Sequence, residues 1–256
     1  MVEQIKLQNL VRLACVIIGG SIAISGAALR GEQVSLFDGR TLQGWTTLDG
    51  QPVTTGWRVE NGMIWLDPSQ GKAGHIMTTR AFGDFKLSFE WKIARGGNSG
   101  LKYRVRSYAG KLYGCEYQIL DDDGYRKRFF PQHSAGALYD LYEPHEDKHL
   151  LPAGKFNSSR ILVRDNVLQH WLNDRLIVSA TVGDAEWKER VARSKFADLR
   201  AFGQNRHGRI MLTDHGSEVW FRNFKMETLS SNRHKSIENA AAERTKQTTP
   251  CALDLP

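Results

Sequence analysis

Three successive alternating runs limit the fold of this 256-residue chain more than any other feature of its sequence. In Phe85–Ile93 apolar side chains occupy every second position with polar ones between them, and residues 101–106 and 115–119 repeat the pattern. A period of two is typical of β-strands that bury one face. The stretch therefore predicts three antiparallel strands, each with one buried and one polar face.

The polar face of these strands carries charged and amide side chains. If the three strands are neighbours in one sheet, opposed side chains come within reach of one another; the four concerned are Glu90, Arg104, Glu116 and Gln118. A solvated sheet face is the simpler interpretation of each residue alone. Together, two carboxylates with an arginine and an amide can supply proton transfer and anion stabilisation.

The rest of the chain continues mainly as short strands. Residues 57–66 form a predicted hairpin around Asn61-Gly62, and residues 160–180 form a meander with tight turns. Only one helix is predicted, and Asp184 can cap it. Many short strands, regular turns and one helix indicate an all-β antiparallel sandwich or jelly roll.

Residues 125–151 lack a steady period and contain three histidines. Long irregular segments in a compact β-domain are usually functional or disordered. Residues 136–142 within this segment are too apolar for disorder. We therefore expect an ordered loop that covers part of a site.

The two ends of the chain differ from its middle. In residues 1–28, Lys6 and Arg12 precede an apolar run and small residues, the layout of a secretory signal peptide cleaved after Ala27 or Ala28. An uncleaved N-terminal anchor is the alternative. Cleavage predicts an exported, periplasmic or extracellular protein without stable membrane insertion. Residues 230–256 have the composition of a flexible tail, which leaves 34–229 as one domain.

Charge is spread rather than clustered. The formal net charge is +7, yet lysine and arginine alternate with aspartate and glutamate throughout. A protein that follows a phosphate backbone needs a basic patch, so the sequence argues against a nucleic-acid partner. Nothing in the composition distinguishes a monomer from a small homo-oligomer, and both are expected states.

Two histidines need separate interpretations. His215 follows Asp214 in a turn, where it can serve as a general base, a metal ligand or a structural group. His170 alternates with leucines on a predicted strand, which favours a buried histidine between the sheets. The aspartates at 121–123 do not have the spacing of a calcium loop, and a single metal held by loop carboxylates stays open.

A series of motifs in fixed order resembles the 3-keto-disaccharide hydrolase family over about residues 34–229. The motifs include Leu36-Phe37-Asp38-Gly39, Gly96-Gly97-Asn98-Ser99-Gly100, Glu116-Tyr117-Gln118, Gly136-Ala137-Leu138-Tyr139-Asp140, Pro152-Ala153-Gly154-Lys155 and Asp214-His215-Gly216-Ser217. The resemblance implies a concanavalin A-like jelly-roll β-sandwich of two antiparallel sheets with one short helix. It also implies an exported bacterial enzyme that cleaves glycosides already oxidised at C3 of the sugar.

The implied reaction is removal of the C2 hydrogen, elimination of the glycosidic oxygen and hydration. A C3 ketone acidifies that hydrogen, so the site needs a base, and a cation or hydrogen-bond donors for the enolate. Our hypothesis assigns the base to Glu116 or His215, and enolate stabilisation to Arg104, Lys155 or a bound divalent metal of undetermined ligands. The substrate-binding candidates are Glu90, Asn98, Gln118, Asp140, Tyr142 and His170.

Two other functions stay open at this point. A non-catalytic, lectin-like carbohydrate-binding domain can use the same polar face without turnover. A retaining glycosidase needs two carboxylates about 5 Å apart, and in this sequence an amide, Gln118, stands two residues after Glu116. That departure disfavours the ordinary glycosidase.

Overall fold

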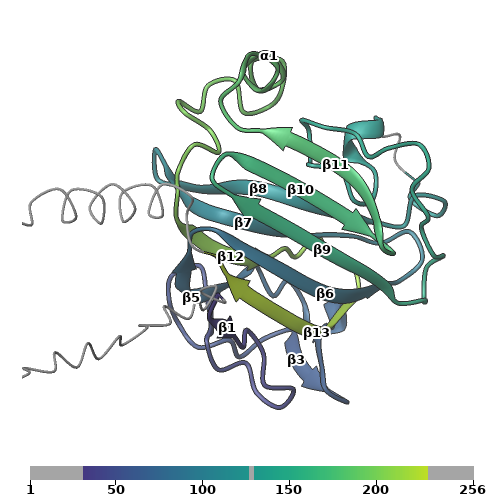
Figure 1. Cartoon of the computed structure of the whole chain (residues 1–256). Helices are drawn as coiled ribbons and strands as arrows, with labels where there is room; N and C mark the ends of the chain where they lie inside the picture. The colour runs from purple at the N-terminus through teal and green to yellow at the C-terminus, as the bar shows by residue number, and fades with distance from the viewer. Residues whose placement is uncertain (1–30, 127–129, 230–256) are drawn as a thin grey trace, which may run out of the picture. The chain divides into compact units, whose positions relative to one another are not determined.

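The computed structural model describes residues 31–126 and 130–229, which form two stacked antiparallel sheets (Figure 1). The predicted signal peptide and tail lie outside the described residues. In the described part, the strands begin at Gln33 and end at Thr228. No helix among these residues is long and apolar enough to cross a membrane.

The larger sheet has eight strands, which we call the front sheet because it faces the viewer in Figure 1. Its strands are β1 (Gln33–Val34), β3 (Trp57–Glu60), β4 (Met63–Leu66), β6 (Phe85–Ile93), β9 (Asn157–Arg164), β10 (Val167–Leu172), β11 (Arg175–Thr181) and β13 (Val219–Thr228). Their order is β11-β10-β9-β6-β13-β4-β3, with β1 also paired to β13. The last strand in the sequence thus lies near the middle of the sheet.

The smaller sheet has five strands and lies behind the first, so we call it the back sheet. Its strands are β2 (Trp45–Thr47), β5 (Ile76–Phe82), β7 (Asn98–Tyr108), β8 (Lys111–Leu120) and β12 (Gly208–Leu212). Their order is β2-β5-β12-β7-β8. Two short 3₁₀ helices, η1 (Pro68–Gln70) and η2 (Pro131–His133), lie in the connections.

The core lies between the two sheets. Every second residue of β6 is buried, as the alternation predicts. These side chains meet those of the back sheet edge to face, with ring centroids 6.2 Å apart for Phe85 and Tyr103 and 5.7 Å apart for Phe89 and Tyr117. Two sheets that bury one face each make a β-sandwich. The predicted all-β sandwich of two antiparallel sheets is confirmed.

One part of the strand prediction is wrong. β6 lies in the front sheet, whereas β7 and β8 pair with each other in the back sheet. The connection through Gly96 and Gly97 carries the chain from one sheet to the other instead of making a hairpin. Since β6, β8 and residues 98–103 of β7 turn their apolar side chains into the core, the polar face of β6 points away from that of β7 and β8.

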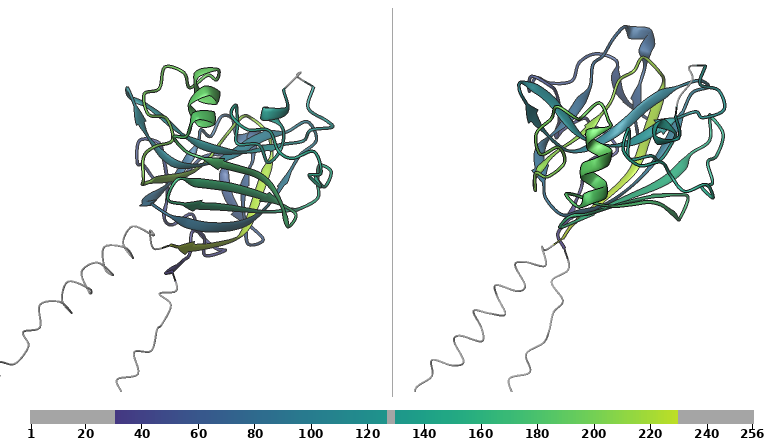
Figure 2. Two further views of the ribbon diagram at one scale, coloured as in Figure 1. Left: turned by 45° about the horizontal axis from the view of Figure 1, so that its top comes forward. Right: turned by 90° about the horizontal axis from the view of Figure 1, so that it is seen from above.

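The helix α1 (Ala185–Ala192), the single α-helix of the described residues, lies at one edge of the sandwich beside β11 (Figure 2). Asp184 caps it as predicted, since its Oδ1 accepts a hydrogen bond from the backbone N–H of Trp187 at 2.7 Å. The Trp187 ring is buried. The helix therefore closes the core at this edge.

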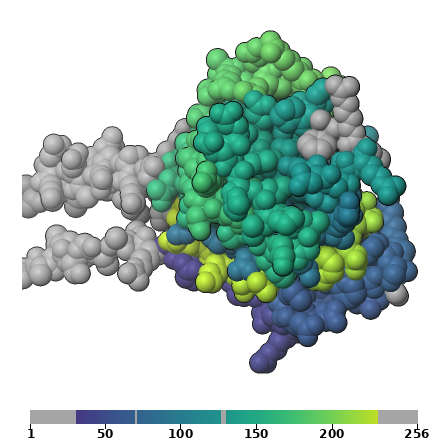
Figure 3. All heavy atoms as spheres, turned by 90° about the vertical axis from the view of Figure 1, so that its right-hand side faces the viewer, coloured from purple at the N-terminus to yellow at the C-terminus, as the bar shows by residue number. Residues whose placement is uncertain are grey.

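The segment between β8 and β9 covers one end of the sandwich, where it faces the viewer as teal spheres in Figure 3. Residues 136–139 of this segment also bond to β8: Gln118 N–H donates to Ala137 O at 3.1 Å, and Tyr139 N–H donates to Glu116 O at 3.0 Å. The predicted ordered loop thus extends the edge of the back sheet next to Glu116.

Candidate functional site

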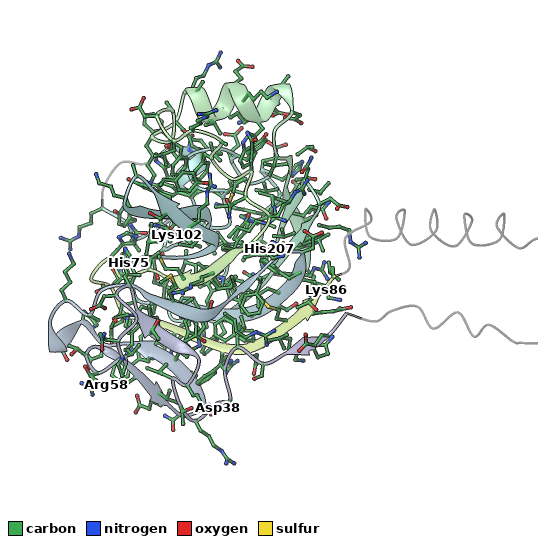
Figure 4. All side chains as sticks on the ribbon, turned by 90° about the vertical axis from the view of Figure 1, so that its left-hand side faces the viewer. Asp38, Arg58, His75, Lys86, Lys102 and His207 are labelled. Carbon is green, nitrogen blue, oxygen red and sulfur yellow. The ribbon has the colours of Figure 1, made fainter. Side chains whose placement is uncertain are left out.

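A group of polar side chains lies on the outer face of the back sheet. The antiparallel register places Lys102 opposite Glu116 and Gly100 opposite Gln118, so Lys102, Glu116 and Gln118 share this face. Lys102 Nζ is 3.7 Å from Glu116 Oε2. Lys102 and His75 lie on the same side of the molecule in Figure 4. β7 and β8 therefore hold a charged pair at a fixed place on a rigid sheet.

Packing, rather than hydrogen bonding, fixes the position of the Glu116 carboxylate. Its side chain is only 5% exposed, yet no donor within the described ranges hydrogen-bonds to it. Gly100 makes room for it: a Cβ at position 100 would lie 2.2 Å from Glu116 Oε1. An oriented carboxylate with free lone pairs can accept a proton or a substrate hydroxyl.

Two amides stand beside this carboxylate on the same strands. Gln118 Nε2 donates to Asn98 Oδ1 at 3.1 Å, and Asn98 Nδ2 lies 3.4 Å from the Tyr125 hydroxyl. The backbone N–H of Asn98 donates to Ser217 Oγ at 3.1 Å. These contacts fix both amides and leave hydrogen-bonding positions of Gln118 for a polar ligand.

Two histidines come from neighbouring loops. The backbone N–H of Asp214 donates to His75 Nδ1 at 2.9 Å, and the ring centroids of His75 and His215 are 5.9 Å apart. The Asp214 carboxylate accepts from the backbone N–H groups of Gly74 and Gly216, at 2.9 and 2.7 Å. Asp214 thus fixes both the loop that carries His75 and the turn that carries His215. Because His75 Nδ1 accepts a hydrogen bond, its Nε2 carries the hydrogen in the neutral ring.

A tyrosine and a lysine complete the group from the side of α1. Lys195 Nζ lies 4.0 Å from the ring centroid of Tyr139, and the His133 ring stacks on Tyr139 at 4.8 Å. Asp140 joins these segments, since it pairs with His133 Nε2 at 2.7 Å and accepts from Lys195 N–H at 2.8 Å. We call the whole set the Glu116 cluster: His75, Asn98, Lys102, Glu116, Gln118, Tyr139, Lys195 and His215.

Burial and nearby charges lower the pKa values of three members of the Glu116 cluster, His75, His215 and Lys195. Desolvation is the main cause that lowers the pKa of His75 to about 4, with the Lys102 charge adding to it. Desolvation also lowers the pKa values of His215 and Lys195, against the attraction of Glu116. Perturbed pKa values of this kind gather at functional sites. Because their pKa values are lowered, His75 and His215 are neutral near pH 7.

A sequence profile decides the family of this chain. The profile of the 3-keto-α-glucoside-1,2-lyase-like domain matches residues 32–227, a range that contains every strand from β1 to β13 except Thr228, the last residue of β13. The chain belongs to this family.

Three proteins that are similar to this chain fit the assignment to the 3-keto-α-glucoside-1,2-lyase-like family. A 3-keto-disaccharide hydrolase from Bacteroides thetaiotaomicron is 28% identical over 227 residues, covering 77% of this chain and 78% of that protein. A solved structure from Parabacteroides distasonis, provisionally named a glycosyl hydrolase, has a TM-score of 0.70 at 31% identity, covering 77% of this chain and 94% of that one. A second structure from this organism shares the fold, with a TM-score of 0.59 at 21% identity over 78% of this chain and 100% of that one. The family resemblance is confirmed, and these names support a glycoside-hydrolase function in general terms.

The structure brings four of the predicted site residues together. Asn98, Glu116, Gln118 and His215 all belong to the Glu116 cluster. Asp140 lies at its margin, where it positions Lys195.

Glu90 and Arg104 lie elsewhere, contrary to the expectation that they share a face with Glu116. Glu90 is on the outer face of the front sheet, where Glu90 Oε2 accepts from Arg222 Nε at 2.8 Å. The Arg104 side chain is 2% exposed and pairs with Asp84 at 2.8 Å. A β-bulge between Tyr103 and Arg106 redirects Arg104, which has a left-handed φ of 51°. We therefore leave both residues out of the proposed reaction.

The other three predicted residues also lie away from the Glu116 cluster. His170 is fully buried between the sheets, where it bonds to the Tyr103 hydroxyl at 2.9 Å and to Gly136 O at 3.0 Å. Tyr142 is buried and stacks against Trp187 of α1. Lys155 is exposed in a turn before β9, and no interaction links it to the cluster in the described part of the chain. The interpretation of His170 as a buried inter-sheet histidine is confirmed.

Four members of the Glu116 cluster are absent from the predicted site. Lys102 shows a usable signal, because it alternates with Leu101 and Tyr103 and so shares a face with Glu116. His75 directly precedes β5, and Tyr139 lies in the connection between β8 and β9. Neither segment has a motif for proton transfer. Lys195 lies after the helix, and nothing local marks it.

The sequence leaves a metal site open. Among the described residues, no three histidine, cysteine, aspartate or glutamate side chains are grouped so that they could hold a metal ion. In the Glu116 cluster, His75 Nδ1 already accepts a backbone hydrogen bond, and two lysines stand close to the remaining donors. These groups do not make a fitting ligand set, so the reaction proposed below uses side chains alone.

Proposed function

We propose that the chain cleaves the glycosidic bond of 3-keto-glycosides at the Glu116 cluster, by elimination and hydration. The observation that carries this proposal is the Glu116 carboxylate, which is nearly buried, free of hydrogen-bond donors in the described structure, and 3.7 Å from the ammonium group of Lys102. A base beside a cation is what removal of a proton next to a ketone needs. The family and the named relatives support the same substrate class.

The first step forms an enolate. The Glu116 carboxylate takes the C2 proton, and the C–H bonding electrons move into the C2–C3 bond while the C3 oxygen becomes negative. Lys102 stabilises that oxygen with its ammonium group. Gln118 and Asn98 hold the sugar hydroxyls, because their amides stand next to Glu116 on the same face.

The second step breaks the glycosidic bond. The enolate electrons re-form the ketone and expel the C1 oxygen, which takes a proton from Lys195. The lowered pKa of Lys195 makes its ammonium group a better acid than an exposed lysine. The product is a 3-keto sugar with a C1–C2 double bond.

Hydration restores the saturated ring. His215, which is neutral because its pKa is lowered, removes a proton from the water that attacks C1. Protonated Glu116, whose carboxyl hydrogen exchanges with solvent while the leaving group departs, gives a proton to C2. The proton that His215 took from water passes through solvent to neutral Lys195, which restores both groups. The sum of the steps is hydrolysis, and the second product is a free 3-keto sugar.

The test uses the purified full-length chain with 3-keto-trehalose and, as a matched substrate, unoxidised trehalose. In D₂O we expect release of 3-keto-glucose that carries deuterium at C2, and no cleavage of trehalose. Glu116→Gln should reduce turnover about a hundredfold or more while the thermal unfolding transition stays in place. Full turnover by Glu116→Gln would refute the assigned base.

Parallel arms separate the competing functions. Binding of 3-keto-trehalose without any product would support a lectin-like domain instead. Cleavage of unoxidised trehalose without deuterium at C2 would support an ordinary glycosidase. Each reaction is repeated with a chelator, because loss of activity there would show that a metal ion takes part.

A further inference from the structure

A second polar recess lies on the opposite face of the domain from the Glu116 cluster, on the outer surface of the front sheet. It is a cavity of about 300 Å³ between β6, β9, β10 and β13, on the side that Figure 1 shows. We call it the outer-sheet cavity; its lining includes Glu90, Ser158, Arg160, Trp171, Asp174, Asn223 and Lys225. Its volume is at the lower end of the range of roughly 300–1,000 Å³ for ligand sites.

An irregularity in β13 helps to form this cavity. The pairing of β13 with β6 shifts between Arg222 and Lys225, so β13 contains one extra residue there. Asn223 adopts a left-handed φ of 55° at the shift, and Phe224 turns into the core. A bulge re-aims side chains at functional sites. Here it directs the Asn223 amide to Glu90.

The Glu90 carboxylate is fixed and still accessible. Glu90 Oε1 accepts from Asn223 Nδ2 at 2.7 Å, and Glu90 Oε2 accepts from Arg222 Nε at 2.8 Å. The Glu90 side chain is 29% exposed. Each carboxylate oxygen has a second lone pair, so Glu90 can accept hydrogen bonds from two neighbouring hydroxyl groups of a ligand.

The opposite wall is aromatic. Trp171 is half-buried on β10, and the Arg160 guanidinium lies 4.3 Å from its ring centroid. Indole rings offer flat apolar surfaces with a polar edge. A tryptophan with Arg160 over its ring, a fixed carboxylate and an amide line one recess. This combination matches a sugar ring, which combines C–H faces with vicinal hydroxyls.

The charges favour a neutral ligand. Two carboxylates, from Glu90 and Asp174, and two cations, from Arg160 and Lys225, line the cavity, and Arg222 is paired with Glu90, so charges of both signs surround a ligand. An anion would meet the two carboxylates, whereas hydroxyl groups can donate to the carboxylates and accept from the cations.

We propose that the outer-sheet cavity binds one neutral hexose unit of a saccharide, independently of catalysis at the Glu116 cluster. Such a site holds carbohydrate on the face of the domain opposite to the reacting groups. Because it binds unoxidised sugar, its function does not depend on the reaction proposed above.

The test measures binding to the full-length chain by calorimetry with four unoxidised disaccharides: trehalose, sucrose, lactose and cellobiose. Glucuronic acid serves as the anionic comparison. At least one neutral disaccharide should bind saturably, and Trp171→Ala and Glu90→Gln should each weaken that binding about tenfold or more. Trp171→Ala should leave turnover of 3-keto-trehalose unchanged.

Two control variants locate the binding. Glu116→Gln alters the other face, and Trp65→Phe alters a tryptophan of the same sheet that does not line the cavity; both should bind sugar like the unaltered chain. The proposal is overturned if no neutral disaccharide binds, if glucuronic acid alone binds, or if Glu116→Gln abolishes binding while Glu90→Gln does not. Glu90→Gln keeps an acceptor oxygen and the side-chain volume, so it tests the site even if Trp171→Ala does not fold.

Discussion

A Cβ atom on Gly100 would lie 2.2 Å from Oε1 of Glu116, so the carboxylate occupies the space that any other residue at position 100 would fill. The two residues lie on neighbouring strands, in the register that also opposes Lys102 to Glu116. The missing side chain of Gly100 thus sets the position of the proposed base.

Gly100→Ala should therefore reduce activity far more than stability. The added methyl group displaces the Glu116 carboxylate, and a shift of about 1 Å at a catalytic group can cost about a hundredfold in rate. Steady-state kinetics with 3-keto-trehalose would measure the loss. Gly114→Ala is the control: its Cβ would lie 2.6 Å from Tyr103 O, near the bulge, so it should lower stability without this specific loss of turnover.

Lys102 should be needed for its charge. Lys102→Met keeps much of the side-chain length but removes the cation next to Glu116, and we expect kcat to fall about a hundredfold to a thousandfold. Lys102→Arg should recover part of the loss because it restores the charge. Equal activity of the methionine and arginine variants would show that the ammonium group does not stabilise the enolate.

Asp140 should act through Lys195. Its carboxylate accepts a hydrogen bond from the backbone N–H of Lys195 and pairs with the His133 ring. Its φ of 63° is a conformation that asparagine also adopts readily. Asp140→Asn should lower kcat several-fold with little change of the melting temperature, because it weakens the link that positions Lys195. The pH profile of kcat should shift with it, which a purely structural role would not produce.

The Arg104–Asp84 pair should matter for stability and not for chemistry. Both side chains are nearly buried, and the pair spans 2.8 Å. Asp84→Ala leaves the Arg104 charge buried without its partner, which should cost about 3–5 kcal/mol in the free energy of unfolding. Urea unfolding would measure this loss. The double variant Asp84→Ala with Arg104→Met should recover stability, and its folded fraction should retain turnover.

His170 should make the fold sensitive to acid. Burial lowers its pKa from 6.5 to about 4. The unfolded chain therefore binds an extra proton between pH 6.5 and 4, so the stabilisation is present above pH 6.5 and is lost as the pH falls through this window. We expect a loss of about 2 kcal/mol between pH 7 and pH 4.5 from this group. Urea unfolding of His170→Asn at both pH values should show a smaller difference.

Period-two alternation predicted the core-facing side chains of β6, of β7 as far as Tyr103, and of β8, because it depends only on which way successive side chains point. Past the bulge it fails, since Val105 lies outside the core between the sheets. It could not assign β6 to a sheet, since a turn through Gly96 and Gly97 is compatible with a hairpin and with a crossing between sheets. Glu90 was therefore placed with Glu116, although the two lie on opposite outer faces.

Arg104 and Lys195 show two other limits of the sequence. One extra residue in β7 ends the alternation at Arg104 and turns its side chain to Asp84, and no residue type marks such a bulge. Lys195 reaches the Glu116 cluster because the segment after α1 packs against Tyr139 and bonds to Asp140. Contacts between distant segments of this kind depend on the whole fold.

The pairing of β1 with β13 places Gln33 beside Glu227, which in turn pairs with Lys86. In Figure 4, Lys86 lies on the opposite side of the molecule from His75 and Lys102. Both end strands of the described domain therefore belong to the front sheet, on the other side of the sandwich from the Glu116 cluster. The same proximity means that a short linker could join the two ends, and a circular permutant opened at the exposed Gly110 turn would keep every strand of the Glu116 cluster intact.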